Sequence, residues 1–304
     1  MRRRPFVAPR STAIAAVILL AAAASACEIT VDAGPYVAHE EKRFRVSGTP
    51  SLSLDTFDGS LEVRSWDRDE ILIEIEKRGP DKAQAEAIQV RAEQVGNTIT
   101  IDVKRPNGRR QGFAFKVSPT ARIIASVPQR CNLLARSGDG GIRVERVAGK
   151  IELRTGDGGV RGVDLSGTLL AHTGAGSMRF DDVEGTVDLE SGDGGARVTG
   201  RLQVVRLRTG DGSVTVRADE GSAMAGEWEI RTGDGGLRLE LPAAFSANLD
   251  ASTGDGVVRF SGFGEPAEPS AQERRRSAVQ RQLNEGGKIL RLRSDSGTIT
   301  IKPL

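Results

Sequence analysis

Hydrophobic and polar residues alternate along most of this chain, and between residues 131 and 260 the alternation itself repeats. Apolar residues recur nine positions apart, as at Val144 and Leu153, and charged residues such as Arg143 and Glu152 stand beside them. Alternation of this kind is typical of a β-strand that places one side chain in a core and the next in solvent. The segment therefore predicts a series of short strands with a half-repeat of nine residues.

A five-residue glycine motif interrupts this alternation at a longer interval. Its copies read SGDGG, TGDGG, TGAGS, TGDGS or TGDGV, and they begin at Ser137, Thr155, Thr173, Ser191, Thr209, Thr232 and Thr253. The first four intervals are 18 residues each, and the last two are 23 and 21. A fixed period near 20 residues is typical of a stack of similar coils. Together with the half-repeat, the motif predicts a β-solenoid with coils of about 18 residues and two strands in each coil.

Glycine occupies both predicted corners of a coil. One corner is the GDG motif, and the other is a single glycine such as Gly149, where a residue without Cβ takes a positive φ at little cost. A left-handed hexapeptide β-helix also has 18-residue coils, but it needs an aliphatic residue at every sixth position. Here Ile142 is followed at that spacing by Ala148 and Arg154, which excludes that fold. We therefore expect an all-β solenoid with two faces.

Residues 1–26 have the pattern of a secretory signal peptide. Four arginines precede an apolar run over residues 13–24, which is shorter than the roughly 20 apolar residues that cross a bilayer. The sequence ASAC at residues 24–27 resembles the lipobox of bacterial lipoproteins, so we expect Cys27 to be the lipid-attachment residue, although an ordinary signal-peptidase site fits the same residues. With Cys27 acylated, Cys131 is a small apolar residue without a partner; otherwise a disulfide between the two stays open.

The rest of the chain divides by how regular the alternation is. Residues 27–42 show little periodicity and are expected to form a tether. Residues 43–130 predict irregular N-terminal coils that cap the solenoid, with one short helix over residues 81–87. A cap is expected because an uncovered end would expose unpaired strand edges. Residues 131–304 predict the regular solenoid.

One stretch of the solenoid, at about residues 264–288, breaks the repeat. Ser270 and Glu273 form a capping box, and the glycine pair at 286–287 supplies a stop signal, so this stretch predicts a helical insertion that carries several arginines. Residues 289–301 then predict a final coil.

Removal of the leader changes the charge of the chain. The full sequence has 43 Lys and Arg against 41 Asp and Glu, a formal net charge of +2, but residues 1–26 hold four arginines and no acid, so 39 against 41 leaves −2. A nearly neutral chain with two Trp, one Tyr and nine Phe has neither the basic surplus nor the stacking aromatics of nucleic-acid-binding proteins. Nucleic acid is therefore not an expected partner.

Three features together resemble a known bacterial family. They are Val127 and Pro128 at the end of a strand, the repeated GDG corners, and the closing sequence SDSGTITI at residues 294–301. The chain from about Phe44 to Leu304 is similar to an adhesin-like domain of unknown function with β-strand repeats, related to autotransporter adhesin head domains. The resemblance implies a single-stranded right-handed parallel β-helix at the bacterial cell envelope, and it brings no catalytic residues.

The chemistry-bearing residues of the chain favour binding over catalysis. Calcium-binding nonapeptide repeats carry GGxGxD at both corners of a coil, whereas here the second corner has no aspartate and Ala175 interrupts the first. We therefore predict no metal and no other cofactor.

No nucleophile stands beside a base in the sequence, and His39 and His172 are far apart. We expect no catalytic residues; a carbohydrate-active β-helix enzyme acting on acidic polysaccharide is the alternative hypothesis.

Arginine recurs on both sides of the GDG corner with the same period. In stacked coils such arginines form rows, and guanidinium groups bind carboxylates and phosphates well. A charge-alternating solvent face explains the same pattern. The candidate residues of a polyanion-binding face are Arg143, Arg154, Arg161, Arg179 and Arg197. The expected partners are an envelope glycan or surface protein and, through the lipid anchor, the membrane.

Overall fold

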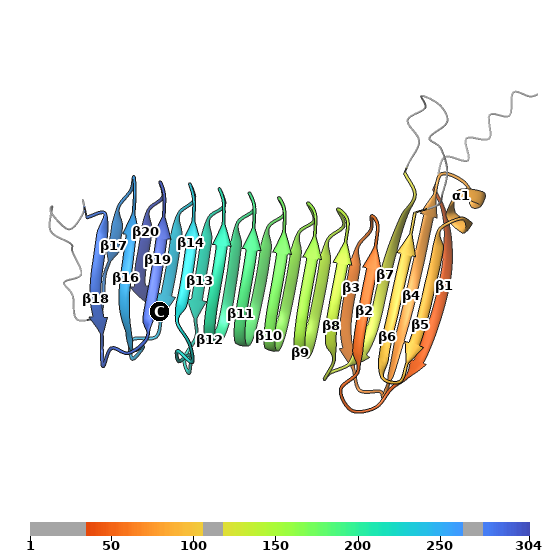
Figure 1. Cartoon of the computed structure of the whole chain (residues 1–304), viewed down its shortest axis with the longest axis horizontal. Helices are drawn as coiled ribbons and strands as arrows, with labels where there is room; N and C mark the ends of the chain where they lie inside the picture. The colour runs from red at the N-terminus through yellow and green to blue at the C-terminus, as the bar shows by residue number, and fades with distance from the viewer. Residues whose placement is uncertain (1–34, 106–117, 264–275) are drawn as a thin grey trace, which may run out of the picture. The chain divides into compact units, whose positions relative to one another are not determined.

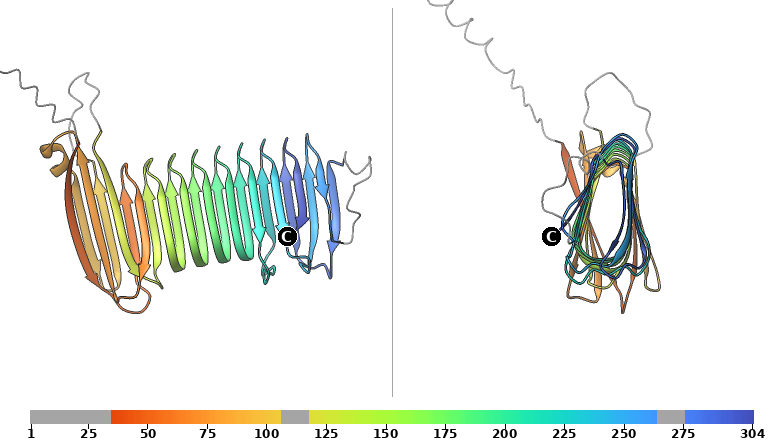
Figure 2. Two further views of the ribbon diagram at one scale, coloured as in Figure 1. Left: turned by 180° about the vertical axis from the view of Figure 1, so that it is seen from behind. Right: turned by 90° about the vertical axis from the view of Figure 1, so that its left-hand side faces the viewer.

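The chain forms a β-solenoid, as its period predicts. The computed structural model describes residues 35–105, 118–263 and 276–304, and the twenty strands in these residues join in one hydrogen-bonded sheet that winds into stacked coils (Figure 1). Seen along the stack, the coils superimpose as a flattened ring with two opposed faces (Figure 2). The post-corner face consists of the strand segments that follow each GDG corner, and the pre-corner face consists of the segments that precede it.

Four long strands form the regular centre of the stack, and each crosses both faces. They are β9 (Ile142–Thr155), β10 (Val160–Thr173), β11 (Met178–Ser191) and β12 (Ala196–Thr209). Each pairs in parallel with the next, at an offset of 18 residues through most of its length. The chain bends between the faces at Gly149, Gly167 and Gly185, whose φ angles are 146°, 110° and 123°. The second predicted glycine corner is therefore confirmed.

The predicted strand register is also confirmed. Val144 on the post-corner face and Leu153 on the pre-corner face both point into the solenoid and are 0% exposed. Arg143 and Arg154, one residue away from each, are exposed. Because this alternation repeats in every coil, the inward side chains form one continuous apolar core along the stack.

Eight strands precede the regular centre: β1 (Tyr36–Arg45), β2 (Ser51–Thr56), β3 (Leu61–Trp66), β4 (Glu70–Gly79), β5 (Gln89–Val95), β6 (Thr98–Lys104), β7 (Thr120–Pro128) and β8 (Asn132–Ser137). Antiparallel pairs close this end, since β4 pairs with β1 and β7, and β5 pairs with β6. The predicted short helix is present as α1 (Lys82–Glu86), where the carboxylate of Asp81 accepts a hydrogen bond from the Gln84 amide at 2.8 Å. Of the described residues, none belongs to a helix with the length and hydropathy to span a membrane.

The tether predicted for residues 27–42 is wrong from Tyr36 onward. Strand β1 begins there and pairs antiparallel with β4. Its side chains are all exposed or half-buried, and its sequence does not show the apolar alternation by which the other strands were predicted. Charged residues such as Glu40 and Lys42 suit a strand at the edge of a sheet, because they discourage pairing with other chains. Residues 27–34 lie outside the described residues.

Eight strands follow the regular centre: β13 (Val214–Ala218), β14 (Trp228–Thr232), β15 (Leu237–Leu241), β16 (Ala247–Thr253), β17 (Val258–Phe260), β18 (Ala278–Leu283), β19 (Ile289–Ser294) and β20 (Ile299–Pro303). The final coil exists, but it is inserted into the stack. β19 lies between β14 and β16, and β20 lies between β15 and β17. The coil of β2 and β3 is inserted likewise, with β2 between β6 and β8 and β3 between β7 and β9 (Figure 1).

The helical insertion predicted at about residues 264–288 is wrong over its described part. Ala278–Leu283 is strand β18, which pairs antiparallel with β16 at the end of the stack. Its two buried residues, Val279 and Leu283, are four positions apart, a spacing that fits a helix as well as a strand. The open edge of β16 decides between them, because it offers backbone partners that a helix could not use. Ser270 and Glu273 lie outside the described residues.

The GDG corners are held by a ladder of buried hydroxyl groups. The hydroxyl of Thr173, which is 0% exposed, donates to the carbonyl of Gly158 at 2.9 Å and accepts from the amide of Gly176 at 3.2 Å. Equivalent bonds join successive coils at Ser137, Thr155, Ser191, Thr209, Thr232, Thr253 and Ser294. The Ser or Thr that opens each motif therefore supplies the polar contact that the apolar core cannot.

Candidate functional site

Four of the five candidate arginines form one straight row. Arg143, Arg161, Arg179 and Arg197 occupy the same register position on β9, β10, β11 and β12, on the outer surface of the post-corner face. All four side chains are exposed. The 18-residue period and the parallel pairing place them on neighbouring strands, which lie about 4.8 Å apart. We call these four residues the arginine row.

The members of the row differ in their partners. Arg143 donates to Glu145 at 2.6 Å and Arg179 donates to Asp181 at 2.8 Å, each two residues further along its own strand. At the matching positions, Arg161 and Arg197 are followed by Val163 and Thr199. Within the described part of the chain these two arginines have no ion pair, so their guanidinium groups are available to an external anion.

Arg154 does not join the row. It lies beyond the bend at Gly149, on the pre-corner face, and pairs with Glu152 at 2.7 Å. Its neighbours at the same register position are Arg136 and His172, and the next coil carries Glu190 there. His172 and Glu190 interrupt this second line of arginines, so Arg154 lies on a different face from the other four candidate residues.

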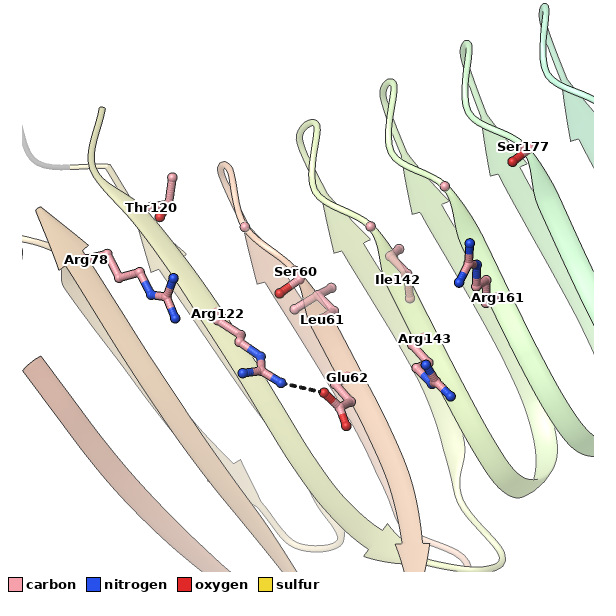
Figure 3. Close-up of a pocket in the computed structure, with 13 residues that line it drawn as sticks. Ser60, Leu61, Glu62, Arg78, Thr120, Arg122, Ile142, Arg143, Arg161 and Ser177 are labelled. Atoms are coloured by element: carbon pink, nitrogen blue, oxygen red, sulfur yellow. Dashed lines mark hydrogen bonds and ion pairs between the residues drawn. The ribbon is translucent and has the colours of Figure 1, made fainter. Parts of the chain in front are cut away.

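A trough of about 640 Å³ lies between the arginine row and the GDG corners (Figure 3). Ser60, Gly141, Gly159 and Ser177 form its floor on four successive coils. Arg143 and Arg161 border it on one side, and Arg122 of β7 and Arg78 of β4 stand at its end. Sequence reasoning missed Arg78 and Arg122, because they come from the antiparallel strands outside the period. Gly59, Leu61, Glu62, Thr120 and Ile142 complete the lining.

Four arginines face a single carboxylate among the residues that line the trough. Arg122 donates to Glu62 at 2.8 Å, and this hydrogen bond raises the pKa of the Arg122 guanidinium. Arg78 donates to Glu76, outside the lining, at 3.1 Å. All of these ion pairs are open to water, and such pairs contribute only about 0–1 kcal/mol. An incoming anion can therefore replace Glu62 as the partner of Arg122 at little cost.

The remaining candidates do not join this site. Cys131 is free, 0% exposed and packed in the core, and burial raises the pKa of its thiol to about 12. Cys27 lies outside the described residues. The aspartates of the GDG corners are exposed at the surface of each turn. Across residues 35–105, 118–263 and 276–304, no three His, Cys, Asp or Glu side chains approach one another closely enough to hold a metal ion.

Comparison with known proteins identifies a family for most of the chain. The model of the family described as Toastrack DUF4097 matches residues 50–302. None of the curated proteins is similar in sequence.

Several solved structures are similar in arrangement at low identity. A "putative lipid binding protein" from Parabacteroides distasonis is 13% identical, with a TM-score of 0.39 over 87% of this chain and 97% of that one. A "putative adhesin" from Parabacteroides merdae is 9% identical, with a TM-score of 0.37 over 87% and 96%. A "putative cell adhesion protein" from Clostridium sporogenes is 12% identical, with a TM-score of 0.29 over 89% and 100%. These values are too low for the neighbours' names to bear on this chain.

Proposed function

The chain belongs to the Toastrack DUF4097 family, and from this premise we propose that it is a non-enzymatic β-solenoid of the cell envelope that binds an acidic polymer along its post-corner face. The observation that carries the proposal is the arginine row. Four arginines occupy one register position on four neighbouring strands, and two of them have no acidic partner in the described structure. Such a row matches an extended polymer with regularly spaced anionic groups.

The spacing of the row suits weak, repeated contacts. Three strand intervals of about 4.8 Å separate Arg143 from Arg197, so the row is roughly 14 Å long. Each guanidinium group can form a forked pair of hydrogen bonds with a carboxylate, sulfate or phosphate. Exposed contacts of this kind are individually weak and screened by salt beyond about 8 Å at physiological ionic strength. Binding is therefore expected to be cumulative and salt-sensitive.

The same surface favours binding over cleavage of such a polymer. Glycoside hydrolysis ordinarily uses two carboxyl groups that flank the scissile bond. The trough beside the row has one carboxylate in its lining, Glu62, and that group is held by Arg122. This supports a binding protein over the alternative of a carbohydrate-active enzyme.

Localisation at the envelope is part of the proposal. The leader and the lipobox-like residues before Cys27 support export across the inner membrane and acylation of Cys27. An acyl chain at that position would hold the solenoid at a membrane, on the periplasmic or outer surface. The rigid stack would then present its arginine row to the polymers around it.

The experiment compares two sets of Arg→Gln substitutions that remove the same amount of positive charge from different faces. The row variant combines Arg161→Gln, Arg179→Gln and Arg197→Gln, and the control combines Arg136→Gln, Arg206→Gln and Arg208→Gln on the pre-corner face. Binding to polygalacturonate, dextran sulfate and inorganic polyphosphate is measured at low and physiological ionic strength, together with polymer length before and after incubation. We expect the row variant to lose most of its affinity and the control to keep it, with polymer length unchanged.

Three results would count against this function. Absence of binding to all three polymers at low ionic strength would leave the row as a solvated surface. Equal loss in both variants would show that net charge, and not the row, governs binding. Shortening of polygalacturonate by the wild-type chain would favour the enzyme instead.

A further inference from the structure

We propose that the trough is a binding site for a single acidic substituent of the polymer, together with the unit of the polymer that carries it. The inference rests on the proposed function of the post-corner face, and it assigns the specificity of polymer binding to the trough. The arginine row beyond the trough would then supply contacts that depend only on charge.

The trough exists because two adjacent coils lack a side chain at one outward position. In stack order this position is held by Ser60, Gly141, Gly159, Ser177, Gly195, Ser213, Gly236, Thr298 and Val257. Gly141 and Gly159 are the only glycines in neighbouring coils within this series of described residues. The two missing side chains leave open the space that the arginines border.

The backbone does not require glycine at either position. Neither Gly141 nor Gly159 has a positive φ. A Cβ built on Gly159 would approach the carbonyl oxygen of Ser177 at 3.5 Å, an ordinary contact, and a Cβ on Gly141 would approach that of Gly159 at 3.2 Å. By contrast, a Cβ on Gly158 would stand 2.2 Å from the carbonyl oxygen of Gly140, so that glycine is required by the stacking. At Gly159, glycine is therefore not needed by the backbone, and its effect is to leave the trough free of a side chain.

The walls of the trough offer donors for an oxyanion. Arg78, Arg122, Arg143 and Arg161 approach it from four different strands (Figure 3). Arg161 has no ion pair in the described structure. The pair of Arg122 with Glu62 is half-buried and still reached by solvent, with side-chain exposures of 37% and 32%. Forked guanidinium donors bind sulfate, phosphate and carboxylate groups.

The size and lining of the trough indicate more than a bare anion. Its volume lies within the roughly 300–1,000 Å³ of small-molecule sites. The hydroxyls of Ser60, Thr120 and Ser177 and the bare backbone of the glycines offer polar contacts, and none of the lining residues is aromatic. A hydroxyl-rich unit bearing one acidic group fits this lining, because it is recognised through hydrogen bonds and charge.

The first test fills the trough without touching an arginine. Gly159→Val places a branched side chain at a position where another coil carries Val257, and Gly236→Val places the same side chain at the same register position outside the trough. We expect Gly159→Val to raise the Kd for the preferred polymer about tenfold, which corresponds to about 1.4 kcal/mol. Gly236→Val should stay within about twofold of wild type. Both variants should melt close to the wild-type temperature.

The second test changes the charge of the lining. Glu62→Gln removes the only carboxylate of the lining and leaves Arg122 with one weaker partner, Glu76 at 3.8 Å. Binding should therefore tighten, whereas Arg122→Gln should weaken it. These two variants keep the proposal testable if Gly159→Val fails to fold. Direct probes are galacturonate, glucose 6-sulfate and glucose 6-phosphate, followed through the amide resonances of Gly141 and Gly159. The probe that shifts them most identifies the acidic group.

The outcomes separate the trough from the proposed function. If the row variant loses polymer binding while Gly159→Val and Glu62→Gln bind like wild type, the trough is wrong and the proposed function stands. If no polymer binds but a probe shifts the glycine resonances, the trough stands and the proposed function fails. If neither occurs, both are wrong. Binding to vesicles that contain anionic lipid, with none to any polymer, would overturn the assignment to a polymer.

Discussion

Arg293 and Asp250 tie the inserted final coil to the strand at the end of the stack. The Nη2 atom of Arg293 on β19 lies 2.5 Å from Oδ2 of Asp250 on β16, and Nη1 donates to the backbone carbonyl of Asp250 at 2.8 Å. Hydrogen bonding to Arg293 holds the pKa of Asp250 below its ordinary value. The pair therefore links a residue near the C-terminus to a strand 43 residues earlier.

Asp250→Asn should destabilise the fold at neutral pH by about 1 kcal/mol, because it removes the charge that Arg293 pairs with. A depressed folded-state pKa contributes stability that is present above the unfolded value of 3.8 and is lost as the pH falls through the folded-state pKa. Urea unfolding of both proteins across this range measures the difference. The difference should shrink toward zero in acid; a constant difference would show that the charge of Asp250 is not its cause.

Two adjacent glycines should differ widely in how much stability the same substitution costs. Gly158→Ala forces its Cβ against the carbonyl oxygen of Gly140 at 2.2 Å, so it should cost about 2 kcal/mol or more. Gly159→Ala meets only an ordinary contact and should lie within about 0.5 kcal/mol of wild type. Thermal melting of the pair measures this. Similar melting temperatures would contradict the close stacking of the GDG corners.

Removal of one hydroxyl from the ladder should be costly. Thr173→Val keeps the shape of the side chain but leaves the carbonyl of Gly158 and the amide of Gly176 without their partner, at about 1–3 kcal/mol. Thr173→Ser keeps both hydrogen bonds, and serine occupies the equivalent position at Ser191, so its loss should be smaller. Chemical denaturation ranks the two. A valine variant as stable as the serine variant would show that the ladder is dispensable.

Cys131 should not react with thiol reagents in the folded protein. Its thiol is buried, and a pKa of about 12 leaves almost no thiolate at pH 8. Alkylation by iodoacetamide at pH 8, followed by mass spectrometry, should show labelling of Cys131 only when denaturant is added. Rapid labelling of the native protein would contradict the burial of Cys131.

Cys27→Ser should release the protein from membranes into the soluble fraction, since an acyl chain needs the cysteine thiol. Fractionation of cells that produce the wild type or the variant measures this, with Cys131→Ala as the control that keeps the anchor site. A wild-type protein that is already soluble and begins at an unmodified Cys27 would show that lipidation is wrong.

The period of the sequence was enough to predict the coils and their register. Eighteen-residue spacing aligns Val144 and Leu153 with their neighbours above and below, and alternation then decides which side chains point inward. The order of the coils could not be predicted in the same way. The repeat does not indicate whether a strand such as β20 adds to the end of the stack or inserts between β15 and β17. That choice depends on which strand edges are left unpaired.

The candidate site shows the same limit. The arginine row follows directly from the period, but Arg154 shares that period and lies on the other face, beyond the bend at Gly149. The trough needs Arg78 and Arg122, which approach from antiparallel strands with no repeat to mark them. Gly141 and Gly159 can be read from the sequence. Their role in leaving the trough open is seen only when the outward positions of the described coils are compared.

The inserted coils determine how the protein responds to mechanical force. β20 has hydrogen-bonded strands on both sides, so a pull on Leu304 must shear two ladders together, whereas a strand at a free tip would peel from one. β2 and β3 are enclosed in the same way near the other end. A force applied at the C-terminus therefore acts first on the coil next to the outermost one, and the outermost coil stays hydrogen-bonded to the stack. A stack built in this way resists unwinding from its tip when its C-terminus is pulled.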